Sequence, residues 1–469
     1  MVGGSLSWAT QEFGAAALGD RRRTARLVRM AAGFADRPGG RVSGTFRVAP
    51  ERNAVYRLLE NKAVNPEEVG RATFRATVER ASGLSFVYVP VDGSSLNITD
   101  DARTRGSGPV GSRKVGARGF QVMTAIGVSP DGTPLGLLGQ AWWSRTEVAA
   151  GEGKRAVEAT ETQHWLDVME SVRAGLAGSG TRAWFQLDRG GDAWPVLQQG
   201  LRDDIWLTVR AAYDRRLRTR PTDEAPPYLW DTLDRRPSLG SYEVDVPGTS
   251  ARKARRARME VRSAFITLDT REKKKGRARD VPVWAVLASE VGTTPPGEEP
   301  LEWMLLTNRT SDTFEASREV VLGYLQRWRV EEFHKAWKSG DCNVEETQLQ
   351  SEQAIHTLAL VLAAVAMRLL RLTYLARRKP DEPASVEFSE EEIAAVLALK
   401  EERPRRGRML TIGVVTRWIA EIGGYTGKSS GGPPGMLVLA RGLAQVEPVA
   451  RALRHLKHSR STPATLSSG

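Results

Sequence analysis

Three stretches decide the fold: SFVYVPVD at residues 85–92, GFQVMTAIGV at 119–128 and GTPLGLLGQAWW at 132–143. Each is short, rich in β-branched or aromatic residues and bounded by Gly, Pro or Asp, which is typical of strands. The Ser-Pro-Asp-Gly-Thr turn at 129–133 joins the second stretch to the third. We therefore predict an antiparallel meander.

The meander is followed by an alternation of helix and strand. A helical stretch at 161–176 precedes two more short strands, RAWFQLD at 182–188 and DIWLTVR at 204–210. Three antiparallel strands followed by α/β alternation is the order of a ribonuclease-H-like fold, by analogy of fold. The sequence therefore predicts the α/β class with a ribonuclease-H-like core.

A β-rich insertion is predicted at about 232–310, where three more short strands occur: SYEVDVP at 241–247, MEVRSAFITLD at 259–269 and VPVWAVLASE at 281–290. Twelve Lys and Arg residues lie between Arg252 and Arg279, including the run REKKKGRAR. Such loops are suited to phosphate contact, with salt-dependent affinity. A flexible solvated loop is the alternative interpretation. Helices are expected to resume from about 311 to 375, before a charged linker, RRKPDEPAS, and a mostly helical tail.

The charge balance favours a polyanionic partner. The chain carries 68 Lys and Arg against 56 Asp and Glu, a net charge of +12. A basic solvated surface without a specific ligand is the alternative. An amphipathic helix from Asp20 fits the first reading, because Arg22, Arg26 and Arg29 share one face opposite an apolar stripe.

Cysteine and histidine usage limits the kinds of metal site. The only cysteine is Cys342, which excludes an internal disulfide and a thiolate zinc site within one chain. The histidines show no close ligand spacing, so a bound metal is expected to be a hard ion held by oxygen; they are His164, His334, His356, His455 and His458. The most apolar run, 357–370, is too short to span a bilayer, and we expect a cytoplasmic protein that binds no membrane.

Two strands end in an aspartate that is a candidate metal ligand. VYVPVD places Asp92 at or just past the end of one strand, and AWFQLD places Asp188 at the end of another. Strand ends present side chains to a cleft, although an aspartate there is more often a turn or cap residue. Asp192, one turn further on, competes with Asp188 for the second position.

The third candidate ligand lies in YLQRWRVEEFHKAWK, residues 324–338, which we read as one helix. At about 100° per residue, Tyr324, Arg327, Glu331 and Lys338 fall in one line along one face, as would suit a phosphate backbone passing a metal ligand. A solvated or core-facing helix face is the alternative. The three aromatic residues elsewhere around the helix are expected in the core: Trp328, Phe333 and Trp337.

With this helix, the chain resembles the cut-and-paste DDE transposases of the insertion-sequence-four family. Their signature Y-x2-R-x3-E-x6-K is met by Tyr324, Arg327, Glu331 and Lys338, within RWRVEEFHKAWK. Further similar stretches run along nearly the whole chain: WATQEFGAAALGDRRRTARLV at 8–28, VDGSSL at 91–96, LDRGGD at 187–192, WLTVR at 206–210, LEWMLLT at 301–307 and RWIAEIGGY at 417–425. Gly93, Ser94 and Gly190 depart from the pattern beside the acidic residues.

The resemblance implies a role for each matched residue. Asp92, Asp188 and Glu331 would bind metal and carry catalysis. The DNA contacts would come from Tyr324, Arg327, Lys338, Lys335, Arg210, Arg22, Arg26 and Arg29, with Trp303 stacking on a flipped base. It also implies three domains: a helical DNA-end-binding domain at 1–70, the catalytic domain at 71–376 and a helical dimerisation domain at 377–469.

The resemblance further implies a two-metal mechanism. Three carboxylates in one place require cations, and two Mg²⁺ ions about 3.5–4 Å apart would neutralise them; we expect Mn²⁺ to substitute. The partners would be transposon-end inverted repeats and target DNA, bound by a homodimer in a bacterial, nucleoid-associated setting without a nucleotide cofactor. Cleavage would pass through a DNA hairpin before strand joining. A catalytically silent DNA-binding regulator and a plain nuclease remain the alternatives.

Overall fold

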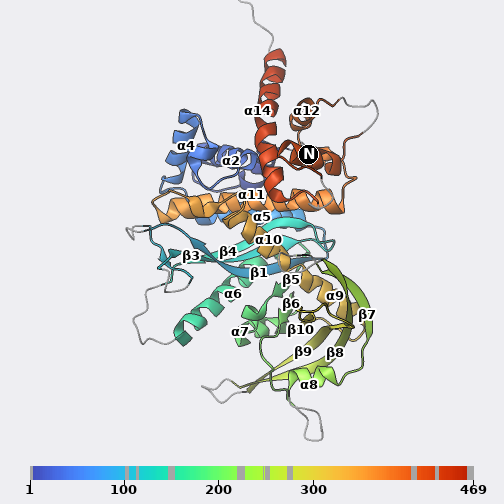
Figure 1. Cartoon of the computed structure of the whole chain (residues 1–469). Coiled ribbons are helices and arrows are strands. Elements are labelled where there is room, and N and C mark those ends of the chain that lie inside the picture. The colour runs from blue at the N-terminus through green and yellow to red at the C-terminus, as the bar shows by residue number, and fades with distance from the viewer. Residues whose placement is uncertain are drawn as a thin grey trace, which may run out of the picture.

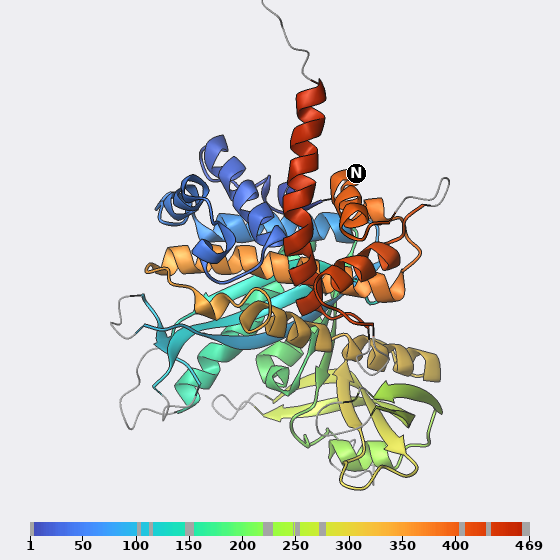
Figure 2. The ribbon, with the colours of Figure 1, turned by 45° about the horizontal axis from the view of Figure 1, so that its top comes forward.

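One large mixed sheet lies beneath a layer of helices from both ends of the chain (Figure 1). The computed structural model describes residues 4–100, 105–111, 116–145, 154–218, 228–246, 248, 254–271, 278–402, 409–427 and 433–461. The view in Figure 2 shows the N-terminal and C-terminal helices on the same side of the sheet. This architecture belongs to the predicted α/β class and is compatible with a ribonuclease-H-like core, with helices at both termini.

The predicted meander is confirmed. β1 (Phe86–Asn97) pairs antiparallel with β3 (Arg118–Val128), and β3 pairs antiparallel with β4 (Pro134–Trp143). β5 (Arg182–Leu187) and β6 (Ile205–Arg210) then run parallel to β1, as α/β alternation requires. The helix α6 (Lys154–Leu176) connects the meander to β5 and packs against the sheet.

The β-rich insertion extends the central sheet. The chain leaves β6 and returns to it, because β10 (Glu302–Thr307) pairs antiparallel with β6. The full strand order is β2-β3-β1-β5-β6-β10-β9-β8-β7, with β4 on β3; the remaining strands are β2 (Gly108–Pro109), β7 (Gly240–Val246), β8 (Arg255–Arg271) and β9 (Ala278–Val291). Residues 272–277 of the predicted basic loop REKKKGRAR lie outside the described residues.

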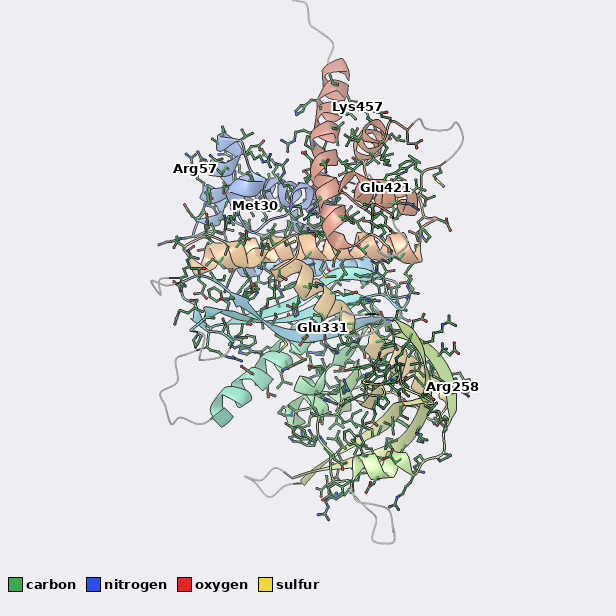
Figure 3. All side chains as sticks on the ribbon, in the orientation of Figure 1. Met30, Arg57, Arg258, Glu331, Glu421 and Lys457 are labelled. Atoms are coloured by element: carbon green, nitrogen blue, oxygen red, sulfur yellow. The ribbon has the colours of Figure 1, made fainter. Side chains whose placement is uncertain are left out.

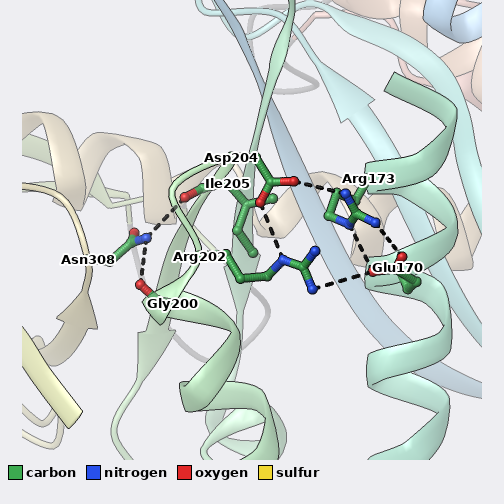
Figure 4. A network of polar contacts seen from close by, with 7 residues as sticks. All are labelled: Glu170, Arg173, Gly200, Arg202, Asp204, Ile205 and Asn308. Carbon is green, nitrogen blue, oxygen red and sulfur yellow. Dashed lines mark hydrogen bonds and ion pairs between the residues drawn. The ribbon is translucent and has the colours of Figure 1, made fainter. Parts of the chain in front are cut away.

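A hydrogen-bonded network fixes the start of β6 to α6 (Figure 4). Arg173 on α6 donates to Asp204 at 2.9 Å and also to Glu170, while Arg202 donates to Asp204 at 3.3 Å. The Asn308 amide donates to two backbone carbonyls at the same end of β6, each at 3.0 Å. Two cations therefore face two carboxylates at the amino end of the strand.

The helical layer begins with a helix predicted from its capping residue. In α2 (Arg21–Asp36) the Asp20 side chain accepts from the Arg22 backbone N–H, and the predicted apolar stripe is buried. The other N-terminal helices are α1 (Ser5–Phe13), α3 (Val42–Thr45), α4 (Ala49–Leu59) and α5 (Pro66–Ala81). Those of the C-terminal part are α12 (Glu390–Leu399), α13 (Ile412–Ile422) and α14 (Met436–Ser461), joined to the core by the 3-10 turn η4 (Ala384–Val386).

The long helix α11 (Glu352–Arg378) lies between the helical layer and the sheet (Figure 1). It packs against α2, α4 and α5 from the N-terminal part, α13 and α14 from the C-terminal part, and β4 of the sheet. By length and composition α11 could cross a membrane, but 94% of its most apolar window is buried inside the protein. A core helix has the same properties.

The segment read as one helix at 324–338 is two helices. α9 (Phe314–Leu325) ends before Gln326, and α10 (Trp328–Lys338) begins after Arg327. At the junction, the backbone N–H groups of Gln326, Arg327, Arg329 and Val330 donate to the carbonyls three residues earlier. This tighter turn breaks the regular helical line of the prediction. The remaining short elements are η1 (Arg189–Gly191), α7 (Trp194–Leu197), η2 (Gln198–Leu201), α8 (Leu229–Asp234) and η3 (Val344–Glu346).

Candidate active site

Two aspartates lie side by side on neighbouring parallel strands. The pairing of β1 with β5 ends at Val91 and Leu187, and Asp92 and Asp188 are the next residue of each chain segment. Adjacent strands lie about 4.8 Å apart. The fold therefore brings together two carboxylates that are distant in the sequence.

The surroundings of the two aspartates differ. Asp188 directly follows β5, and its carboxylate accepts the Gly190 backbone N–H at 2.8 Å. The sequence had placed Asp92 at or just past the end of its strand, but the strand continues beyond it. β1 continues to Asn97, because Asp92 still pairs with Thr124 of β3. Asp92 thus marks the point where β1 leaves β5 and continues with β3 alone.

Glu331 on α10 is connected to Asp92 by Arg327, which contacts both carboxylates. The helix packs against β1 and β3, and Figure 3 shows Glu331 over the central strands. Arg327 Nη2 lies 2.7 Å from Glu331 Oε1, and Arg327 Nη1 lies 3.9 Å from Asp92 Oδ2. Only 8% of the Arg327 side chain is exposed, and its Nε has no hydrogen-bond partner among the described residues. One buried guanidinium therefore lies between two of the three carboxylates.

The electrostatics of Asp92 show that the three carboxylates act on one another. Burial and the charge of Asp188 raise the pKa of Asp92 to about 7, and Glu331 adds to the shift. Arg327 and the Gly93 N–H oppose it. Burial and the neighbouring carboxylates therefore favour the protonated form of Asp92, and Arg327 does not fully offset them.

The chemistry of this donor set fits a hard divalent cation, which prefers carboxylate oxygens. Within the part of the chain that the structure describes, no three His, Cys, Asp or Glu side chains are close enough to hold one ion. The ion pair with Arg327 explains why Glu331 does not complete such a group. Glu331 bonds the guanidinium, so it would have to release Arg327 before it could bind a metal ion. Asp92 and Asp188 already lie next to each other without such a change.

Tyr324 and Arg210 border the acidic group. Burial raises the pKa of the Tyr324 hydroxyl, although the charges of Arg327 and Arg210 oppose the shift, so the hydroxyl lies near both. Tyr324 is only 2% exposed and belongs to α9. Arg210, the last residue of β6, donates to the Glu302 carbonyl at 3.0 Å. The residues of the predicted line are therefore divided between α9 and α10, and Arg210 of β6 lies near Tyr324.

The two lysines of α10 differ in their surroundings. Lys338 Nζ donates to Ser94 Oγ at 3.3 Å and lies 3.7 Å from Glu345 Oε1. Lys335 is exposed. Sequence reasoning gave Ser94 and Glu345 no role at the site, because they are far from Lys338 or outside the motif and nothing in their local pattern marks them.

Asp192, the competitor for the second aspartate position, has partners within the fold. Its side chain is fully buried, lies 2.6 Å from Arg215 Nη2 and accepts the Ala212 N–H at 2.7 Å. These contacts use its carboxylate oxygens within the fold. Asp188, by contrast, is partly exposed, lies next to Asp92 and accepts the Gly190 backbone N–H.

Two tryptophans with expected roles differ in their exposure, and the expectation that Trp328 lies in the core is wrong. Trp303, expected to stack on a base, is 9% exposed and part of the hydrophobic core, so base stacking would require it to leave this packing. Trp328, expected in the core, is 50% exposed, because the inward face of α10 is formed by Val330, Phe333 and Trp337. The Arg327 guanidinium lies 5.1 Å from the centre of the Trp328 ring.

The basic stripe on α2 is present. Arg22, Arg26 and Arg29 are all exposed. Arg26 and Arg29 also line a hollow whose opposite wall, on α14, includes Arg451 and Arg454. The stripe is therefore accessible, and at one end it faces the C-terminal helix.

A comparison with known protein families identifies the segment that carries this stripe. Residues 5–64, which contain α1, α2, α3 and α4, match the family described as transposase DNA-binding. The match ends before α5 and leaves the sheet outside it. The chain thus carries a transposase DNA-binding segment at its N-terminal end, which supports a DNA-binding transposase with DNA as its partner.

Proposed function

We propose that the protein is a metal-dependent cut-and-paste transposase of the insertion-sequence-four family, similar to the transposase of transposon five. The proposal rests on the gathering of three carboxylates: Asp188 and Glu331 both act on the Asp92 carboxyl, and Arg327 contacts Asp92 and Glu331. The transposase DNA-binding match at the N-terminus supports it independently of the acidic group.

Asp92, Asp188 and Glu331 would hold Mg²⁺, or Mn²⁺ in its place, against a phosphodiester. When bound, the metal ions would activate the attacking oxygen and stabilise the leaving oxygen. Asp92 must lose its proton to act as a ligand, which its raised pKa makes sensitive to pH near neutrality. Glu331 must exchange its bond to Arg327 for the metal.

The cationic residues around the acidic group would hold the DNA backbone. A phosphate near Arg327 would compete with Glu331 for the guanidinium, because both are oxygen anions that accept charge-assisted hydrogen bonds. DNA binding would thereby free Glu331 as a ligand. Lys338 lies beside Ser94 and Arg210 lies near Tyr324, so both would contact the backbone together with Tyr324; the exposed Lys335 of the same helix would add a further cation.

The same site would perform several in-line displacements in sequence. Water would first attack the phosphodiester at the transposon end and free a 3′-hydroxyl. This hydroxyl would attack the opposite strand to form a hairpin, water would reopen the hairpin, and the 3′-hydroxyl would then join target DNA. Each transesterification keeps the number of phosphodiester bonds constant, so no nucleotide cofactor is required. A homodimer would hold the two ends together.

The proposed function is tested with the full chain and the DNA that flanks its coding region. We expect Mg²⁺-dependent cleavage at inverted repeats, followed by joining to a target plasmid. Glu331→Gln should abolish cleavage and leave end binding within about threefold of the original. Glu332→Gln is the matched control, because Glu332 is the next residue on α10 and pairs with Arg329 at 2.8 Å outside the acidic group.

Three results would contradict the proposal. Cleavage without joining would identify a plain nuclease, and binding without cleavage would identify a silent DNA-binding regulator. Retained cutting by the Glu331→Gln variant would remove this residue from the mechanism.

A further inference from the structure

The short turn η3 (Val344–Glu346) connects the candidate site with the N-terminal helices. It follows α10 by a few residues and packs against α10, α11 and β1. On its other side, Arg41 Nε lies 3.3 Å from Glu346 Oε2. A Cβ atom added at Gly40 would lie 2.0 Å from the Asn343 carbonyl oxygen, so the two backbones approach closely. The turn is therefore held between the site and the matched DNA-binding segment.

Glu345 is the residue of η3 that reaches the site. Its Oε1 accepts the Asn97 backbone N–H at 2.8 Å, at the last residue of β1. The same oxygen lies 3.7 Å from Lys338 Nζ. Lys338 Nζ in turn donates to Ser94 Oγ, two residues after Asp92. One carboxylate thus connects the extension of β1 beyond Asp92 with the helix that carries Glu331.

The geometry points to Glu345 as a positioning residue for Lys338 and for the part of β1 that follows Asp92. The inference rests on the proposed function, in which Lys338 contacts a DNA phosphate. Glu345 would not touch DNA or the reacting atoms. It would act by holding the ammonium group beside Ser94 and by fixing the end of the strand.

The distances explain how Lys338 can be held and still bind DNA. An ammonium group has three N–H donors, and Ser94 accepts one of them. At 3.7 Å, Glu345 attracts Lys338 electrostatically and leaves donors available for a phosphate. About a quarter of each side chain is exposed, at 26% for Lys338 and 25% for Glu345, so the pair is only partly screened by solvent.

The two functions of the Glu345 carboxylate can be separated by substitution. Glu345→Gln removes the charge that faces Lys338 and keeps an oxygen that accepts the Asn97 N–H. Glu345→Ala removes both. Glu346→Gln is the matched control, because Glu346 is the neighbouring residue and its ion pair with Arg41 is half exposed on both sides.

We expect binding and catalysis to respond differently to Glu345→Gln. Without the neighbouring negative charge, Lys338 should attract DNA equally or more strongly, so the Kd for end DNA should stay the same or fall by up to about threefold. The misplaced ammonium should slow the cleavage of bound DNA about tenfold, because small displacements at a reacting centre are costly. A loss of fold would instead weaken binding and cleavage together. Glu346→Gln should change neither.

Amide exchange supplies a readout that does not depend on activity. In the DNA-free protein, exchange at the Asn97 N–H should accelerate at least tenfold in Glu345→Ala. It should stay unchanged in Glu345→Gln and Glu346→Gln. Unchanged exchange in the alanine variant would overturn the part of the inference that concerns β1.

A double-mutant cycle tests whether Glu345 acts through Lys338. In a Lys338→Met background, Glu345→Gln should have no further effect on cleavage. If the two effects simply add, the inference is wrong while the role of Lys338 stands. If Lys338→Met changes neither binding nor cleavage, then the proposed DNA contact of Lys338 is wrong, and the inference falls with it. The two failures are therefore distinguishable.

Discussion

Charged side chains are arranged differently at the two ends of the parallel strands. At the amino end of β6, Arg173 and Arg202 face Glu170 and Asp204 (Figure 4). Where the pairing of β1 with β5 ends, Asp92 and Asp188 are neighbours, and Arg327 contacts Asp92 and Glu331. The first edge balances its charges within the chain, and the second does not.

The pKa values follow the same contrast. Hydrogen bonding to Arg173 lowers the pKa of Glu170, and although burial raises that of Asp204, hydrogen bonds from Arg173 and Arg202 lower it overall. Burial and Asp188 raise the pKa of Asp92 to about 7. The carboxylates at the start of β6 thus have cationic partners that favour their charged form, whereas the surroundings of Asp92 favour its protonated form.

The largest effect is expected from removing charge at the uncompensated edge. Asp188→Asn should reduce Mg²⁺-dependent end cleavage roughly 10³-fold, or about 4 kcal/mol of activation free energy, because a ligand of the proposed metal site is lost. Asp204→Asn, at the balanced edge, should leave the cleavage rate within about twofold. Single-turnover assays measure both cleavage rates. Equal rates for the two variants would contradict the different roles assigned to Asp188 and Asp204.

The second effect concerns pH and the stability of the metal-free protein. The Asp92 carboxyl has a usual pKa of 3.8 and a folded value of about 7. Between these values the folded state binds the additional proton, so stability should fall as the pH rises from about 4 to 7 and should then level off. The fall is at most about 4 kcal/mol. Urea unfolding at several pH values should show this slope, and Asp92→Asn should remove it.

The third effect separates Asp192 from Asp188. Asp192→Ala leaves Arg215 without its buried partner and should lower the free energy of unfolding by about 3 kcal/mol. Asp188→Ala should change it little or raise it, because repulsion with Asp92 is relieved. Urea midpoints for both variants measure the difference. Equal destabilisation would contradict the distinct roles assigned to the two aspartates.

The smallest effect is expected at the balanced edge itself. Arg202→Gln removes a partly exposed pair with Asp204 and a longer one with Glu170, at 3.9 Å. Such pairs contribute at most about 1 kcal/mol, so the urea midpoint should shift only slightly. Raising the salt concentration should reduce the difference between the original protein and the variant, because salt screens the pair that the variant lacks.

Local patterns in the sequence were sufficient to predict much of the fold. The meander followed from short apolar runs and one turn, and α2 followed from its Asp20 cap and apolar spacing. The extension of β1 beyond Asp92 did not, because Gly93 and Ser94 have weak strand preference and β3 supplies the pairing. Tertiary contacts there outweigh local propensity.

The candidate site was predictable in its residues and less so in its arrangement. Spacing along an ideal helix placed Tyr324 and Glu331 on one line, but the tight turn at Arg327 divides that helix. The burial of Arg327 between two carboxylates depends on β1 and could not be read from spacing. The choice between Asp188 and Asp192 as a candidate ligand depends on Arg215, because its ion pair with Asp192 forms only in the folded chain.

The course of α11 makes the three parts of the molecule interdependent. Its 27 residues extend about 40 Å. The helix packs against the N-terminal helices, the sheet and the C-terminal helices. A fragment cut at residue 64, where the transposase DNA-binding match ends, would lose the surface that covers its apolar side. Truncated fragments would therefore expose apolar surface and aggregate, so the parts of this protein are best studied by point substitutions in the intact chain.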